Sequence, residues 1–449
     1  MTNERFQSIG RQYTMRVKDF FNGLIEGKLV LGFAKIAFPL SIQDSALPEG
    51  MVFQRAHVVA LFLNGTHTGP INADGLRVDY DLVMRNGFRA MGEVRLLGAK
   101  IGGNLSCVNG HFSDPNGNAL SADGVKVGGT VFLANGFQAT GEVRLLGAKI
   151  GRDFVCINGH FNNPNGKALN ADRVEVGGNV LLKDEFQATG EVCLLGAKIG
   201  GNLECDNSHF SNPNGKALNA DRVDVKGSVF LRDQFQAEGV VDFSIATVGQ
   251  SFQWWDVKNP ELCTLRLESA RIGTLLDAEK SWPKKLYLDG LVYDRLHNKA
   301  PVGWKERLEW LERQDYKEPC NNKLLRFLAK RAPSDRVRNA IFALDSYRRT
   351  KKKFVPQPYV QLAKVLKEMG HEGDAKNILI EKERARRQFG KLGIRGWVWN
   401  WGLDVTIRYG YRTHRALLVL LVLQRHMVMI YPANTRAVLR CGCLLRPVR

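Results

Sequence analysis

Three residue types that can carry out chemistry recur along the chain at a constant spacing of 49 positions. Histidine and cysteine side chains bind zinc, paired cysteines form disulfides, and grouped carboxylates cleave glycosidic bonds. The recurring residues are His111, His160 and His209, then Cys107, Cys156 and Cys205, then Asp74, Asp123, Asp172 and Asp221. Whether any of these sets forms a site depends on the elements that position them.

These residues belong to a unit that occurs three times without a gap. It begins as GEVRLLGAKIGGNL at Gly92, as GEVRLLGAKIGRDF at Gly141 and as GEVCLLGAKIGGNL at Gly190. Each copy continues through a His-Phe pair, a Pro-Asn-Gly segment expected to turn, and a segment such as ALNADRVEVGG. Aligning Ile101 with Val127 superimposes the apolar positions of the two halves of one unit. One structural coil therefore corresponds to about half of the unit.

The coils predict a β-solenoid. Apolar and polar residues alternate in short stretches separated by glycine pairs and Asn-Gly turns, which a helix could not accommodate. Strands this short are stable only when they pair with the next coil. Degenerate coils extend the pattern, so we expect a mainly β, right-handed parallel β-helix of about eleven coils over residues 27–300. Apolar residues at helical spacing from Val17 to Ile25 predict an amphipathic capping helix within residues 1–26, and helices after Trp304 would cover the other end.

The solenoid geometry argues against a site in any of the three sets. Adjacent coils lie ~4.8 Å apart, so equivalent residues two coils apart are separated by roughly 9.6 Å. Zinc–nitrogen bonds are about 2 Å long and disulfides need Cα atoms within ~7 Å, so neither the histidines nor the cysteines can share an ion or a bond. We expect packing roles for both, and turn hydrogen bonds for the aspartates.

Sequence motifs for cofactors are also missing. GAKIGG lacks the spacing and the strand–helix context of a dinucleotide-binding loop, and the Gly166-Lys167 pair lacks the rest of a phosphate loop. Cys441-Gly-Cys443 is neither a zinc nor a redox spacing. We therefore expect no catalytic residue, no cofactor and no metal site.

The net charge of +19 is confined to the C-terminal third. From Lys305 onward the chain has 32 Lys or Arg against 13 Asp or Glu, and the preceding residues have 32 of each. Helical apolar spacing, as at Leu308 and Leu311, predicts a basic α-helical domain over residues 301–395. Such a domain would attract either nucleic acid phosphates or an anionic membrane surface.

The following residues favour the membrane. Aromatic residues and arginines flank an apolar run from Ala416 to Leu423, a combination typical of a membrane interface, and residues 396–449 are expected to form an interface tail. The predicted interface residues are Trp397, Trp399, Trp401, Tyr409, Tyr411, Arg412 and Arg415. Since the run is too short to span a bilayer, we hypothesise that the chain leaves a transmembrane reading frame near Gln424.

The N-terminal sequence predicts a cytosolic protein. Glu26, Lys28 and Lys35 interrupt every apolar stretch that could act as a signal peptide. Eight cysteines in a long chain without such a signal do not indicate a disulfide framework. We expect a reducing compartment.

Three motifs, taken in order, resemble a known group of proteins. GEVRLLGAKIGG with its partner coils, then QPYVQLAKVLKEMGHEGDAKNILI, then DVTIRYGYRTHRALL resemble bacterial membrane-associated solenoid proteins, related in style to pentapeptide-repeat and bactofilin β-helices. The resemblance covers about Gly27 to Leu423. Such proteins are often labelled membrane-associated oxidoreductases, so the resemblance implies a redox function and a transmembrane segment.

These observations predict a non-enzymatic, membrane-associated scaffold. Its partners would be an anionic membrane surface and a protein, or a second copy, bound to the solenoid faces; nucleic acid is not expected. The positive-inside rule places it on the cytoplasmic face of the inner membrane. The alternative is a membrane-associated oxidoreductase with a redox site that the sequence does not reveal. DNA mimicry ranks last, because it needs a strongly acidic solenoid and this one is neutral.

Overall fold

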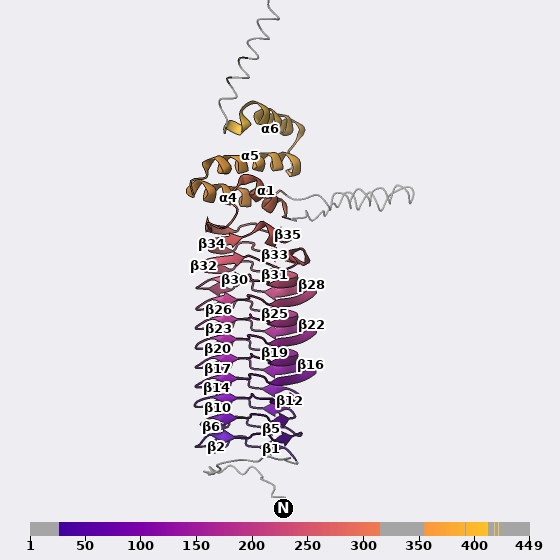
Figure 1. Cartoon of the computed structure of the whole chain (residues 1–449), viewed down its shortest axis with the longest axis vertical. Helices are drawn as coiled ribbons and strands as arrows, with labels where there is room; N and C mark the ends of the chain where they lie inside the picture. Colours follow the sequence, from indigo (N-terminus) through magenta and orange to yellow (C-terminus); the bar gives the residue numbers. More distant parts are fainter. Residues whose placement is uncertain (1–26, 315–353, 391, 412–416, 418–420, 422–449) are drawn as a thin grey trace, which may run out of the picture. The chain divides into compact units, whose positions relative to one another are not determined.

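The protein is built around a parallel β-solenoid of about 12 turns, followed by a short helical region (Figure 1). The computed structural model describes residues 27–314, 354–390, 392–411, 417 and 421. The predicted fold class is confirmed, with about one turn more than expected. The predicted capping helix within residues 1–26 and the hypothesised frame change near Gln424 lie outside the described residues.

Each turn contributes up to four strand positions, and equivalent strands of successive turns stack into four columns. Columns 1 and 4 form one parallel sheet, in which long strands span both positions in the middle turns. Column 1 starts with β1 (Leu29–Val30), β5 (Met51–Val52), β9 (Ile71–Asn72) and β13 (Val94–Arg95) and ends with β33 (Cys263–Arg266) and β35 (Lys285–Tyr287). Column 4 starts with β4 (Ala46–Leu47), β8 (His67–Thr68) and β12 (Arg89–Met91). The spanning strands are β16 (His111–Ser121), β19 (Gln138–Arg144), β22 (His160–Asn170), β25 (Gln187–Cys193), β28 (His209–Asn219) and β31 (Gln236–Asp242).

Columns 2 and 3 form the second parallel sheet. Column 2 contains β2 (Lys35–Ile36), β6 (His57–Val58), β10 (Arg77–Val78), β14 (Lys100–Ile101), β17 (Lys126–Val127), β20 (Lys149–Ile150), β23 (Glu175–Val176), β26 (Lys198–Ile199) and β29 (Asp224–Val225). Column 3 contains β3 (Leu40–Ser41), β7 (Leu61–Phe62), β11 (Leu82–Val83), β15 (Leu105–Ser106), β18 (Val131–Phe132), β21 (Phe154–Val155), β24 (Val180–Leu181), β27 (Leu203–Glu204) and β30 (Val229–Leu231). The last turns merge both positions in β32 (Thr247–Trp254), β34 (Arg271–Asp277) and β36 (Val292–Leu296).

The strand register confirms that the 49-residue unit is two turns. Lys100 pairs with Lys126, and Lys126 pairs with Lys149, so the turns alternate between 26 and 23 residues. Val94 lies opposite Leu120, as the alignment of the two halves predicts. Because the side-chain period of a strand is two, this register keeps the recurring apolar positions, such as Val94 and Leu120, on the inside.

The Pro-Asn-Gly segments differ from the prediction. They lie inside the long strands β16, β22 and β28, which project from one edge of the stack in Figure 1, and do not form separate turns. The pairing shifts register between Ser113 and Asn118, so the additional residues bulge outward. In the second copy the Asn163 amide donates to the Lys167 carbonyl at 2.9 Å and closes this bulge.

A stack of aromatic rings runs through the core beside column 4. Successive turns each contribute one ring, and neighbouring ring centroids are 5.2–5.7 Å apart in tilted or edge-on arrangements. The stack consists of Phe88, Phe112, Phe137, Phe161, Phe186, Phe210, Phe235 and Trp254. Tilted contacts at this separation add stabilisation beyond the buried area. The phenylalanine of each repeated His-Phe pair is therefore a core residue.

Helices cover the C-terminal end of the solenoid, as predicted. Helix α1 (Trp304–Glu312) leads into Gln314, which bridges to Leu286 of β35. Helix α4 (Gln357–Glu368) lies along β36, where the Gln361 amide donates to the Tyr293 carbonyl at 2.7 Å. Backbone groups at the last strand edge thus find partners in side chains, which is how a solenoid end avoids pairing with another chain.

A buried ion pair fixes α1 on the last turns. Arg307 is 0% exposed, and its guanidinium donates to both carboxylate oxygens of Asp277 at 2.8 Å. Asp277 also accepts from the Trp282 indole at 2.8 Å, and Arg307 donates to the Pro301 carbonyl at 2.7 Å. Burial lowers the pKa of Arg307, but Asp277 outweighs this effect and the net shift is upward. The charge is therefore retained inside the protein.

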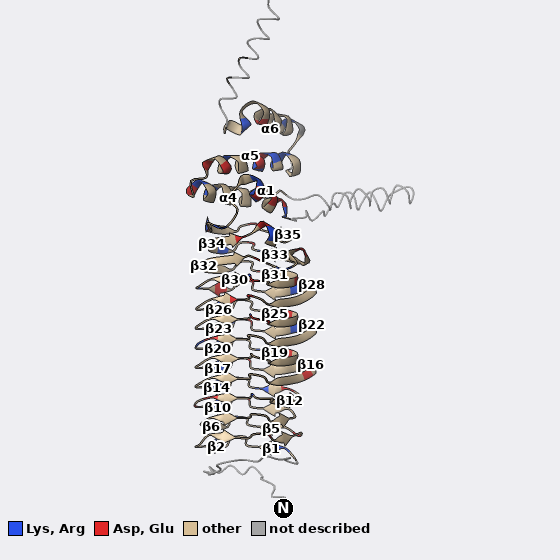
Figure 2. Cartoon of the chain, in the orientation of Figure 1, with Lys and Arg blue, Asp and Glu red and all other residues tan. Residues whose placement is uncertain are grey.

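The chain divides into two compact units. The first contains the solenoid, the short helices η1 (Pro260–Leu262) and η2 (Glu279–Ser281), α1 and α4. The second contains most of α5 (Glu372–Phe389), α6 (Ile394–Ile407) and η3 (Arg408–Gly410). Acidic residues lie in the first turn of α5 and arginines in its last turn (Figure 2), which complements the helix dipole.

Candidate functional site

Helix α6 is polar on its buried side and aromatic on its exposed side. Asn400 and Asp404, one helical turn apart, are each 8% exposed, whereas Trp399, which directly precedes Asn400, is 71% exposed. This is the reverse of the usual arrangement in a water-soluble protein, in which the apolar face of a helix is covered. The exposed side therefore requires an explanation other than core packing.

Ion pairs hold the polar side of α6 against α5. Asp404 accepts from Arg384 and from Arg387, each at 3.0 Å. Burial raises the pKa of Asp404, but these two guanidinium groups outweigh it and the net shift is downward. The Tyr409 hydroxyl donates to the Asn400 amide oxygen at 2.9 Å. This network fixes the rotation of α6 and hence which side chains face outward.

The exposed side carries three of the predicted interface residues. Trp397 is 47% exposed, Trp399 71% and Trp401 51%. Trp399 and Trp401 line a shallow, mainly apolar depression together with Arg395, Val398 and Leu403. No helix of the described residues is both long enough and apolar enough to cross a bilayer.

The other predicted interface residues are placed differently. Tyr411 is 38% exposed, whereas Tyr409 is half-buried and belongs to the polar network, where burial raises its pKa to about 12. Arg412 and Arg415 lie outside the described residues. The sequence could not distinguish Tyr409 from its neighbours, because only the packing on α5 shows which residues Asn400 contacts.

The recurring cysteines have the packing role expected of them, whereas the recurring histidines are half-buried residues at the surface of column 4. Cys107, Cys156 and Cys205 are fully buried, and burial raises the pKa of each thiol. The histidines alternate with glutamines along column 4, as where His111 pairs with Gln138 and Gln138 with His160. Among the described residues, no three metal-binding side chains converge.

The recurring aspartates connect neighbouring turns. Asp74 accepts from Arg95 at 2.8 Å and from the Leu97 backbone N–H at 3.2 Å, one turn later. Asp123 repeats both contacts with Arg144 and with the Leu146 N–H. In the third copy a cysteine stands where the arginine would be, and Lys167 of the same turn pairs with Asp172 at 3.2 Å. Their role is structural, as predicted, and it includes ion pairs as well as turn hydrogen bonds.

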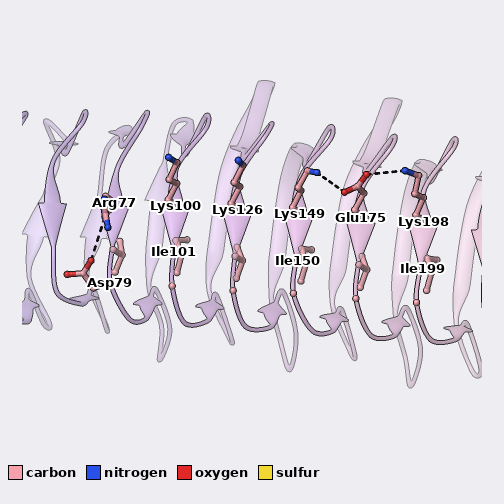
Figure 3. A pocket seen from close by; sticks show the side chains of 18 of the residues that line it. Arg77, Asp79, Lys100, Ile101, Lys126, Lys149, Ile150, Glu175, Lys198 and Ile199 are labelled. Atoms are coloured by element: carbon pink, nitrogen blue, oxygen red, sulfur yellow. Dashed lines mark hydrogen bonds and ion pairs between the residues drawn. The ribbon is translucent and has the colours of Figure 1, made fainter.

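A second surface was missed from the sequence. A groove of about 890 Å³ follows column 2 across seven turns, from Arg77 to Asp224. The outward side chains along it form one row of closely spaced charges (Figure 3). We call this surface the lysine groove. The row of outward side chains is its rim, which consists of Arg77, Lys100, Lys126, Lys149, Glu175 and Lys198. The signal was present in the sequence, since a basic residue precedes the Ile-Gly or Val-Gly pair in most turns.

Glycines form the floor of the lysine groove because the turns approach one another closely there. A Cβ atom added to Gly128 would lie 2.2 Å from the carbonyl oxygen of Gly102, and one added to Gly151 would lie 2.3 Å from that of Gly128. No side chain can therefore rise between the lysines and the next corner of the solenoid. The groove is therefore concave because the glycine backbones of successive turns stack closely.

Comparisons with known proteins do not indicate what these surfaces bind. No family model matches the chain, and neither a curated protein nor a solved structure matches it. The chain is a protein of coiled β-solenoid repeats.

Proposed function

We propose that the protein is a membrane-associated scaffold, attached by α6 to an anionic surface at the cytoplasmic face of the inner membrane. The observation that carries this proposal is the reversed polarity of α6, with Asp404 buried and Trp399 exposed. Exposed tryptophan is unfavourable in water and favourable at the boundary between lipid headgroups and acyl chains. Ion pairs with α5 supply the rigidity that keeps these rings outward.

The mode of attachment would be interfacial. The tryptophans lie within little more than one turn of α6 and would enter the headgroup region from a helix that lies in the plane of the membrane. Basic residues near this surface, such as Arg395, would add about 1 kcal/mol each through attraction to anionic lipids. The positive-inside rule favours the cytoplasmic face for a chain whose excess of Lys and Arg lies beside its aromatic segment.

The scaffold role rests on the solenoid. Stacked turns present long, regular columns of outward side chains, and such surfaces suit binding of a protein partner or of a second copy. The recurring cysteines are buried in the core and recurring aspartates form ion pairs between turns, which favours a structural role over a catalytic one.

Flotation with lipid vesicles tests the membrane proposal. The full chain should float with vesicles that contain phosphatidylglycerol, and much less with pure phosphatidylcholine. Changing Trp397, Trp399 and Trp401 to Ser should lower the partition coefficient between vesicles and water at least ~100-fold. This is the effect expected when the exposed area of about one tryptophan no longer enters the lipid. The buried side of α6 is untouched by these changes, so its helicity should persist in circular dichroism.

The matched control is Tyr80→Ser, because Tyr80 is an aromatic residue that is 65% exposed on the solenoid. This variant should float like the unaltered protein. Equal flotation of the triple Trp variant, or recovery of the unaltered protein only in the vesicle-free fraction, would overturn the proposal.

A further inference from the structure

Two neighbouring lysines on the rim of the lysine groove, Lys100 and Lys126, differ from the charged residues of column 1. In column 1 Arg95 and Arg144 are each paired with an aspartate one turn earlier. In column 2 Lys100 and Lys126 lie directly opposite one another, and neither has an acidic partner within the described part of the chain. Like charges opposite one another in a ladder are destabilising. An anion bound across the row would relieve this repulsion.

The glycine N–H groups on the floor of the groove are already hydrogen-bonded to the preceding turn. The Gly102 N–H donates to the Val78 carbonyl at 2.9 Å, and the Gly128 N–H donates to the Ile101 carbonyl at 2.8 Å. Recognition must therefore come from the side chains of the rim. Lysine acts as a flexible point charge, which suits a ligand whose anionic groups recur along its length.

The length of the row indicates a polymer. Seven turns at ~4.8 Å per turn give a groove about 29 Å long, too long for a single small anion. The lining contains no aromatic residue, so nucleic acid bases would have nothing to stack on. Asp79, Glu175 and Asp224 interrupt the cations at intervals, and they would repel a chain such as polyphosphate, whose charges are closely spaced and which has no hydroxyl groups between them.

We propose that the lysine groove binds a linear anionic polysaccharide, a chain of acidic sugars that lies along the solenoid axis. Its carboxylates would contact Lys100, Lys126 and Lys149. Its hydroxyl groups would donate to the carboxylates, above all to Glu175. Such a polymer differs from polyphosphate because it has one carboxylate per sugar unit and hydroxyl donors between the carboxylates, which match the mixed signs of the rim.

The chain itself supplies a matched variant for testing this. Glu175 accepts from Lys149 at 2.8 Å and from Lys198 at 3.2 Å, so one Lys–Glu–Lys ladder already exists in the groove (Figure 3). Lys126→Glu would place the same ladder between Lys100 and Lys149. The variant should therefore fold at least as well as the unaltered protein while it loses the central cation of the groove.

Binding of fluorescently labelled polygalacturonate oligomers to the full chain tests the proposal by anisotropy at low salt. Lys126→Glu should weaken binding at least about tenfold, because a cation is replaced by an anion beside the ligand. Lys258→Glu is the control, since it makes the same change of net charge at an exposed residue outside the groove. The control should bind within about twofold of the unaltered protein.

Four results would overturn the proposal: no binding of polygalacturonate, an equal loss in both variants, equal binding of the methyl-esterified neutral polymer, or tighter binding of oligothymidylate or polyphosphate. Vesicle binding is read out separately. The triple Trp variant of α6 should keep its polygalacturonate affinity, and Lys126→Glu should keep its vesicle binding. The membrane proposal and the polysaccharide proposal can therefore fail independently of each other.

Discussion

Replacing Arg307 by methionine should release α1 from the end of the solenoid. Arg307 and Asp277 are buried, share two hydrogen bonds of 2.8 Å and come from elements 30 residues apart in sequence. Methionine fills much of the volume of the side chain but leaves Asp277 charged, with the Trp282 indole as its remaining side-chain donor. Breaking a buried pair from one side costs about 3–5 kcal/mol.

Removing both charges together should cost much less. In Arg307→Met combined with Asp277→Leu, no charge is left in the interior, and buried ion pairs replaced by apolar residues of similar volume are often neutral. The coupling energy of the double-mutant cycle should therefore be at least about 2 kcal/mol. Lys364→Met is the control, because Lys364 pairs with Glu368 on the exposed surface of α4 at 4.0 Å and should contribute at most about 0.5 kcal/mol.

Hydrogen exchange of the α1 amides measures the local opening free energy, which suits a repeat protein whose unfolding need not be two-state. Arg307→Met should raise the exchange rates of α1 by two to three orders of magnitude, while the double variant restores most of the protection. Loss of protection in Arg307→Met no larger than in Lys364→Met would refute the reasoning. So would a double variant whose loss equals that of the two single variants combined.

Three further predictions concern the solenoid. Phe161→Ala should lower the free energy of unfolding by about 3–5 kcal/mol and Phe161→Leu by much less, because the ring stack tolerates a change of shape better than a cavity; denaturant titration compares them, and equal losses would contradict this. Ser244 and Lys216 outweigh burial and lower the pKa of Asp242, so its stabilisation is present above about pH 4 and is lost as the pH falls further. Asp242→Asn should therefore lose less stability between pH 5 and 3 than the unaltered protein, and a parallel loss would show that Asp242 is not responsible. Burial raises the pKa of Cys193 to about 12, so its peptide should resist iodoacetamide at pH 8 in the native protein and react in denaturant; rapid native labelling would contradict the buried position.

Much of the solenoid could be predicted from the repeat alone. A period of 49 residues made of two similar halves fixes which residues of successive turns lie opposite one another, and Val94 does pair with Leu120. The structural role of the Cys and Asp sets followed from the same periodicity, because equivalent residues are held two turns apart. The Pro-Asn-Gly segments were predicted less well, since a turn and an outward bulge in a strand use the same residue types.

The lysine groove shows what a periodic sequence reveals only after its turns are aligned. Lys100, Lys126 and Lys149 are unremarkable as isolated surface residues at intervals of 26 and 23 positions. They become one row because hydrogen bonding between turns places strands within about 5 Å of one another. The row is thus implicit in the sequence, whereas its concavity depends on how closely the glycine backbones pack.

The sequence by itself determined the repeat, the register and the neutral solenoid with its basic C-terminal third, because all three depend on spacing and composition. Only the tertiary structure decided which side of α6 is covered, since the tryptophans at 397, 399 and 401 have the two-residue spacing of a strand and do not form a helical stripe. It also decided that Arg307 pairs with Asp277, because a single contact between a helix and a distant strand leaves no periodic pattern in the sequence. Local patterns encode local pairing, and the partners of single buried charges emerge only when the chain is folded.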